Sequence, residues 1–229
     1  MDFPLISTLW LDIKTVNSMI DFRTVNIIEY ETARAERVSL SSLLCQGSPN
    51  RFIAFDTETT GLDPNHDRLT EVGAVLYENG CIINHFQSLI FSDVPVPEHV
   101  SALNHITEEI LKTAPAEKSV LQRLVAFMGD AVYGRTLICG HVPAFDMSFL
   151  CHALNRAGIT ADFRFVDTRE LAVTIPDLTS HSLSAVADYF KIPHDKVHRA
   201  KEDAILSGQI FLKILRNRSI LQVTEKDHG

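Results

Sequence analysis

A short apolar segment that runs directly into two carboxylates is the feature that most restricts this chain. Residues 52–55 read Phe-Ile-Ala-Phe, and Asp56, Thr57 and Glu58 follow at once. A brief apolar run that ends at a turn signal is typical of a buried strand. Because side chains two residues apart on a strand point to the same side, we expect Asp56 and Glu58 to share one face, about 6–7 Å apart along the strand.

Two carboxylates held this close at the end of a buried strand repel each other and are poorly solvated. A pair of divalent cations between them removes both costs, and enzymes that hydrolyse phosphodiesters with two metal ions need this arrangement. The alternative is an acidic strand end that water solvates as the chain enters the turn at residues 61–64. Further carboxylates downstream favour the metal site.

The composition limits the remaining possibilities. The chain has 229 residues, 45% of them hydrophobic, which suits one domain with an extension. No stretch approaches the roughly 18 consecutive apolar residues of a membrane span, and the first residues do not resemble a secretory signal. The four cysteines show no metal-ligand spacing, and Cys139 and Cys151 are expected to be reduced core residues. We therefore expect a cytoplasmic protein with no membrane contact.

The net charge of −8 and the pI of about 5.6 argue against tight binding to an extended duplex, which usually requires a basic stripe. They do not exclude a nuclease that holds a few nucleotides at a strand end, because bound metal ions supply positive charge locally.

The order of patterns along the chain predicts an α/β fold. We divide it into an N-terminal helical extension (1–50), a catalytic domain (51–217) and a C-terminal tail (218–229), with the breaker cluster at residues 46–50 as the first boundary. The predicted strands lie at residues 52–57, 69–76, 81–91, 136–140 and 163–167, with a hairpin turn at Asn79-Gly80. The predicted helices begin after the N-cap Thr107 and lie near residues 121–128, 144–157, 182–190 and 199–216. Such an order gives a mixed five-stranded sheet flanked by helices.

Two further carboxylates fall on these predicted helices. Asp146 lies one turn before Phe149 and Leu150, so we expect it to point inward, where an aspartate is costly unless it is paired or bound to metal. A solvated aspartate favoured by the helix dipole is the alternative. Asp203 shares a helix face with Ser207 and Ile210, and His198 lies on the loop just before it.

These residues together resemble the DEDDh family of 3′–5′ exonucleases, which includes the proofreading epsilon subunit of bacterial DNA polymerase III. The likeness rests on Asp-x-Glu in the first strand, His-x-x-x-Phe-Asp in a helix and His-x-x-x-x-Asp near the C-terminus. It runs from about residue 51 to residue 215 and implies a ribonuclease H-like fold.

The resemblance also implies roles for individual residues. Asp56, Glu58, Asp146 and Asp203 would hold two divalent cations, Mg²⁺ or Mn²⁺, and His198 would act as general base. The further residues that the resemblance places near the terminal nucleotide are Thr57, Thr59, Leu62, Ile106 and Phe145. Core packing is the alternative role for Leu62, Ile106 and Phe145.

The chain departs from the family pattern at two places. Val142 stands where many members have asparagine, and Asn104 and His105 replace a histidine and a glycine in a segment that often reads His-Gly-Ile-Thr. Neither change removes a predicted metal ligand.

The expected activity is therefore hydrolysis of single-stranded or frayed DNA 3′ ends to nucleoside 5′-monophosphates, in proofreading or repair, with a DNA polymerase subunit as a candidate partner. The sequence leaves two alternatives open. One is an exoribonuclease that trims short RNA oligomers, since recognition of the 2′-hydroxyl depends on pocket shape. The other is an inactive adaptor of the same fold that binds nucleic acid or a polymerase.

Overall fold

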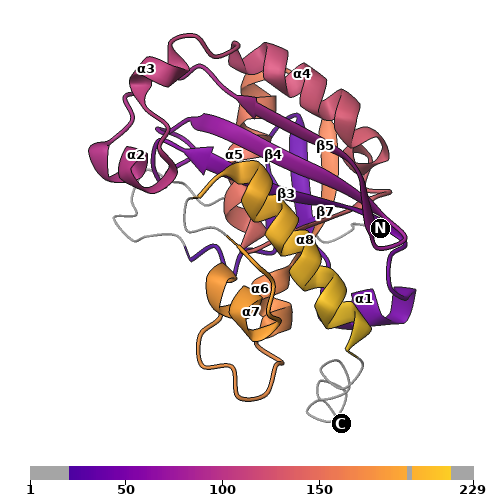
Figure 1. Ribbon diagram of the computed structural model, residues 1–229. Helices are drawn as coiled ribbons and strands as arrows, with labels where there is room; N and C mark the ends of the chain where they lie inside the picture. The colour runs from indigo at the N-terminus through magenta and orange to yellow at the C-terminus, as the bar shows by residue number, and fades with distance from the viewer. Residues whose placement is uncertain (1–20, 195–197, 218–229) are drawn as a thin grey trace, which may run out of the picture.

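One mixed sheet of seven strands organises the protein, as seen in the computed structural model, which describes residues 21–194 and 198–217 (Figure 1). The strands are β1 (Ile27–Glu29), β2 (Ala33–Arg37), β3 (Arg51–Thr59), β4 (Leu69–Glu78), β5 (Cys81–Leu89), β6 (Leu137–Gly140) and β7 (Ala161–Asp167). Their order across the sheet is β1-β2-β7-β6-β3-β4-β5. The β3–β4–β5 meander and the β1–β2 pair are antiparallel, whereas β2, β7, β6 and β3 run parallel.

Helices cover both faces of this sheet. They are α1 (Leu40–Gln46), α2 (Glu98–Asn104), α3 (Glu108–Leu111), α4 (Glu117–Met128), the 3₁₀ helix η2 (Gly129–Val132), α5 (Pro143–Ala157), α6 (Thr168–Ala172), α7 (Leu183–Tyr189) and α8 (Ala200–Arg216). Alternate residues of β3 pack against the helices on opposite faces of the sheet. Ile53 and Phe55 pack in the cluster that includes α4 and α5, and Phe52 and Ala54 pack in the cluster that includes α8. The sheet is therefore buried on both sides along β3.

Most of the predicted elements from residue 51 onward are confirmed. Asn79 and Gly80 both have positive φ, as a tight hairpin turn requires. The Thr107 side chain caps α3 by accepting a hydrogen bond from the Ile110 amide. Helix α5 ends at Gly158, and its inward residues are buried. The buried, free thiols of Cys139 and Cys151 are also as expected.

The count of five strands was wrong, because residues 27–37 form β1 and β2 rather than helices. In β2 the buried Ala33 and Ala35 alternate with charged residues, and the strand pairs in parallel with β7. Alanine has a weak preference for strands, so here the tertiary pairing outweighs local propensity. Of the helices predicted for the N-terminal extension (1–50), α1 is present. The apolar residues at 9–11 and 19–20 lie outside the described residues.

Helix α2 was not predicted.

In the part of the chain that the structure describes, no helix is both long enough and apolar enough to span a membrane.

Candidate active site

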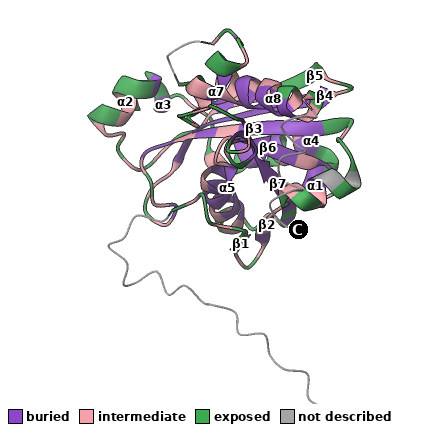
Figure 2. Cartoon of the chain, turned by 90° about the horizontal axis from the view of Figure 1, so that it is seen from below, coloured by how far each residue is buried: buried purple, intermediate pink, exposed green. Residues whose placement is uncertain are grey.

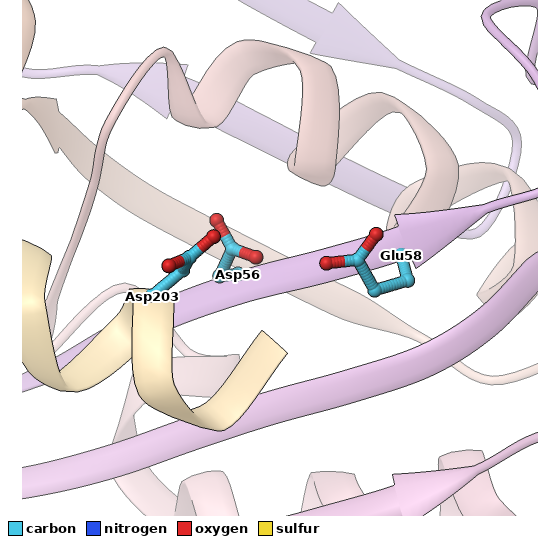
Figure 3. A group of neighbouring side chains, drawn as sticks. All are labelled: Asp56, Glu58 and Asp203. Carbon is cyan, nitrogen blue, oxygen red and sulfur yellow. The ribbon is translucent and has the colours of Figure 1, made fainter. Parts of the chain in front are cut away.

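Three carboxylates from two distant parts of the chain meet beside the end of β3. Asp56 and Glu58 project from β3, and Asp203 projects from the first turn of α8 (Figure 3). One oxygen from each carboxylate lies within 4.8 Å of the others. Oxygen donors spaced in this way suit Mg²⁺ or Mn²⁺, so the donor set fits divalent cations.

A glycine allows α8 to come this close to the strands. Gly73 of β4 is directly opposite Asp56 in the β3–β4 register. A Cβ atom on Gly73 would overlap the backbone of Ala200 and Lys201 at the start of α8. Because Gly73 has no side chain, the first turn of α8 rests on the strand next to Asp56, and Asp203 faces that carboxylate.

His198 lies at the exposed side of this group. Its Nδ1 atom is 2.9 Å from Oδ2 of Asp203, and 57% of its side chain is exposed. The hydrogen bond to Asp203 orients the ring, while its exposure leaves it able to exchange protons with water or a ligand.

Asp146 is near these carboxylates but does not join the three that converge. It is 4% exposed, and its Oδ1 atom accepts hydrogen bonds from the amide (2.8 Å) and the hydroxyl (2.7 Å) of Thr57. The β3–β6 pairing ends at Ala54, so α5 approaches the β3 backbone just beyond it. Asp146 therefore fixes α5 to β3, the strand that carries Asp56 and Glu58.

Burial, together with the charges of nearby acids, raises the pKa of Asp56, Glu58, Asp146 and Asp203. Removal from water raises the pKa of Asp56 well above its usual range, and the charges of Asp146 and Asp203 raise it further. Burial raises the pKa of Glu58 to about 7, although its hydrogen bond from Asn104 opposes the shift. Burial likewise raises the pKa of Asp146 to about 7 against the hydrogen bonds from Thr57, and raises that of Asp203 against the one to His198. Protonation or the binding of cations would therefore stabilise this group of acids.

The residues expected to contact a nucleotide lie in different environments. Leu62 is 63% exposed, and Phe145 is half-buried, so both have surface available to a ligand. Thr57 and Thr59 are buried in β3. Ile106 is only 2% exposed, and its amide donates a hydrogen bond to Oδ1 of Asn104.

Asn104 contacts the acidic group, a role that the sequence did not indicate. Its Nδ2 atom donates to Oε2 of Glu58 at 2.9 Å, and His105 follows with a left-handed backbone at φ 58°. Asn104 thus orients Glu58, and glycine, which the family often has where His105 stands, would adopt this conformation without strain.

Glu71 was also missed, although it is the one acidic residue in the apolar run at residues 69–76. It is fully buried, lies opposite Glu58 in the register, and accepts from Nη2 (2.6 Å) and Nε (3.0 Å) of Arg199. It also accepts from the amide of Ala200 at 3.1 Å. Its burial in an apolar run was a signal that it needs a partner. The pair fastens the residue after His198, and the start of α8, to the sheet.

The departure at Val142 coincides with a strained backbone. Val142 has φ 61° and ψ 46° at the start of α5, a conformation that β-branched residues rarely adopt. Its amide donates to Oδ1 of Asp167 at 3.0 Å, which holds the turn in place. Asparagine, common here in the family that the sequence resembles, enters this region more readily.

Comparison with known proteins identifies the family of this chain. The family model described as Exonuclease matches residues 53–211. DNA polymerase III subunit epsilon of Treponema pallidum is 33% identical over 172 residues, which cover 73% of this chain and 78% of that protein. The PolC-type DNA polymerase III of Caldanaerobacter subterraneus subsp. tengcongensis is 33% identical over 165 residues, covering 72% of this chain but 11% of that much longer protein.

Solved exonuclease structures share the fold at low sequence identity. Exonuclease X in complex with 5′ overhanging duplex DNA aligns with a TM-score of 0.56 and 22% identity, over 74% of this chain and 92% of that one. E. coli Exonuclease I in complex with a dT13 oligonucleotide aligns with a TM-score of 0.65 and 17% identity, over 78% and 43%. These neighbours confirm the ribonuclease H-like α/β class. The chain belongs to the Exonuclease family, and it is similar to the epsilon subunit of DNA polymerase III.

Proposed function

We propose that this protein is a DEDDh-type 3′–5′ exonuclease that removes nucleoside 5′-monophosphates from single-stranded or frayed DNA ends. The observation that carries the proposal is the convergence of Asp56, Glu58 and Asp203, with His198 hydrogen-bonded to Asp203. The names of the relatives, a replicative polymerase and an epsilon subunit, support DNA as substrate and proofreading or repair as the setting.

The acidic residues would hold two Mg²⁺ or Mn²⁺ ions. When bound, such ions stabilise charge on the attacking and leaving oxygens of a phosphodiester. Asp56, Glu58 and Asp203 supply the converging oxygens, and Asp146, which Thr57 holds on α5 nearby, would be the fourth ligand. Asn104 and Thr57 keep Glu58 and Asp146 in fixed orientations through the hydrogen bonds described above.

His198 would act as the general base. It would accept a proton from the attacking water, whose oxygen forms a bond to the terminal phosphorus while the bond from phosphorus to the 3′ oxygen of the preceding nucleotide breaks. The released 3′ oxygen then takes a proton from solvent. The exposed ring can then pass the proton to solvent, and its bond to Asp203 holds it toward the acidic group.

Matched DNA and RNA oligomers, incubated with the purified protein and Mn²⁺, test this proposal. The expected result is stepwise release of nucleoside 5′-monophosphates from the 3′ end of DNA, faster than from RNA, and no release in EDTA. Faster turnover of short RNA would favour an exoribonuclease, and no release from any 3′ end would favour an inactive adaptor.

A DNA polymerase is the partner that the relatives suggest. Co-elution of this protein with the replicative polymerase of the same organism in size-exclusion chromatography would support that partnership, and separate elution at micromolar concentration would contradict it.

A further inference from the structure

The segment before β3 packs against the helix that carries Asp146, although the family match begins only at residue 53. Strands β1 and β2 both contact α5 (Figure 2), and the half-buried Phe22, Val25 and Tyr30 pack on the same core as α5. This segment is therefore positioned to contribute to the site to which α5 supplies Asp146.

Phe22 contacts the residue that precedes Asp146 in the chain. Its ring lies edge-on to the ring of Phe145, with centroids 5.3 Å apart and an interplanar angle of 88°. Phe145 immediately precedes Asp146, and on its inner side it contacts Phe149 at 5.0 Å. Phe22 and Phe145 are both only half-buried, so this row of rings leads from the core to a surface beside Asp146.

Arg37 holds Phe22 in this position. Its buried side chain, 5% exposed, donates to the carbonyl of Phe22 (3.1 Å) and to that of Val25 (3.0 Å). It also donates to Oδ2 of Asp167 at 3.2 Å, and Oδ1 of the same aspartate accepts from the Val142 amide at the start of α5. The backbone at Phe22 and the start of α5 are thus tied to the same carboxylate, so the two rings are held in a fixed relation before any ligand arrives.

We propose that Phe22 and Phe145 together form an aromatic surface that binds a nucleobase of the substrate strand next to the terminal nucleotide. Stacking on aromatic rings reads no sequence, so such a surface suits an enzyme that accepts any 3′ end. The inference rests on the proposed function for its ligand class, a single-stranded nucleic acid. It assigns part of the substrate site to a segment outside the family match.

A binding measurement separates this role from simple packing. In a His198→Ala background with Mn²⁺, where the strand is cut slowly, fluorescence anisotropy follows a labelled single strand of about ten nucleotides. Phe22→Leu should raise the Kd by about 5- to 100-fold, because one base–aromatic contact is lost. The matched control is Tyr30→Leu, since Tyr30 is a half-buried aromatic residue of the same segment that stacks on His152 instead; its Kd should stay within about twofold of that of the His198→Ala parent.

A small substrate provides the second readout. With His198 intact, hydrolysis of the p-nitrophenyl ester of thymidine 5′-monophosphate, which lacks the neighbouring nucleobase, should fall by a much smaller factor on Phe22→Leu than the affinity for the strand does. An unchanged Kd for the strand would overturn the proposal. A parallel loss of ester hydrolysis and strand binding would also overturn it, because Phe22 would then act only by positioning Asp146.

Two results keep this inference distinct from the proposed hydrolysis. If the unsubstituted protein releases no mononucleotide while strand binding still depends on Phe22, the catalytic proposal fails and the aromatic surface stands.

Photo-crosslinking of the unsubstituted protein to a strand with 5-iodouracil next to its 3′ end does not depend on the folding of any variant. A crosslink in the peptide that contains Phe22 is expected, and crosslinks confined to other peptides would overturn the inference.

Discussion

Two groups of carboxylates lie at the same end of the sheet, and they differ in their partners. Glu71 and Asp167 are buried, and each has an arginine from a distant part of the chain: Arg199 binds Glu71, and Arg37 binds Asp167. The second group, which we call the acidic site, consists of Asp56, Glu58, Asp146 and Asp203. Glu58, Asp146 and Asp203 have hydrogen bonds with Asn104, Thr57 and His198, yet burial, together with the charges of nearby acids, raises the pKa of all four members.

This difference separates structural carboxylates from functional ones. A buried carboxylate that is paired with an arginine has its charge balanced within the fold. A carboxylate group that lacks such balance costs stability and persists where the charge serves a purpose, such as binding external cations. The comparison predicts that neutralising a member of each group changes stability in opposite directions.

The largest effect is expected from Asp56→Asn in the acidic site. Exonuclease turnover should fall by roughly 10³-fold or more, because the change removes a ligand whose charge a metal-dependent reaction needs. The protein should stay folded, and its melting temperature at pH 8 in EDTA should rise because one repelling charge is gone. Single-turnover kinetics and thermal melting measure the two effects; full activity would contradict the assignment.

His198→Ala should reduce the rate by about 10²–10⁴-fold, the usual contribution of a positioned general base. Since His198 is exposed and outside the converging carboxylates, Mn²⁺ affinity should change little. Calorimetric titration with Mn²⁺ is the control, and loss of metal binding would show that His198 has a different role.

Glu71→Gln tests the paired group. The free energy of unfolding should fall by about 1–3 kcal/mol, because the change leaves the Arg199 guanidinium, itself partly exposed, without its buried counter-ion. Urea denaturation measures this effect. A gain in stability like that expected for Asp56→Asn would remove the distinction between the two groups.

The metal-free protein should become less stable as the pH rises from about 4 to about 7. Glu58 and Asp146 each have a pKa of about 7 in the folded state, above their ordinary values of 4.5 and 3.8. The folded protein therefore binds more protons than the unfolded chain in this interval, and its stability is lost as those protons leave. Melting temperatures in EDTA across this range measure the effect, and Mn²⁺ should restore stability most at the upper end. A melting temperature that increases steadily toward pH 7 in EDTA would contradict the raised pKa values.

The smallest effect is expected at Val142. Val142→Asn should increase the free energy of unfolding by about 1 kcal/mol, because asparagine tolerates the left-handed conformation better than a β-branched residue. Val142→Thr is the matched control and should bring no gain, since threonine is also β-branched. Equal stability of the two variants would show that the strain is not relieved by the amide side chain.

The sequence predicted the elements whose patterns are local. The apolar run of β3 and the Asn79-Gly80 turn each carry their signal within a few residues, as do the helical faces of α4 and α5. The shared face of Asp56 and Glu58 followed from strand geometry alone. The placing of Asp203 beside them needed the resemblance, since β3 and α8 are far apart in the chain.

What the sequence did not predict depends on distant partners. Glu71 is explained only by Arg199, which lies 128 residues away. Asn104 is explained by Glu58, and strand β2 by its pairing with β7. Asp146 was expected among the converging carboxylates, but Thr57 holds it to the β3 backbone, a contact that no sequence spacing indicates.

Mn²⁺ titration of the intact protein at pH 7, with proton release measured in buffers of different ionisation enthalpy, tests the central claim most directly. We predict saturable binding of two Mn²⁺ ions, displacement of protons from acids whose pKa lies near 7, and loss of both signals in Asp56→Asn. Binding that is no tighter than in Asp56→Asn, with no proton release, would show that the acidic site does not hold metal, and the account would be wrong.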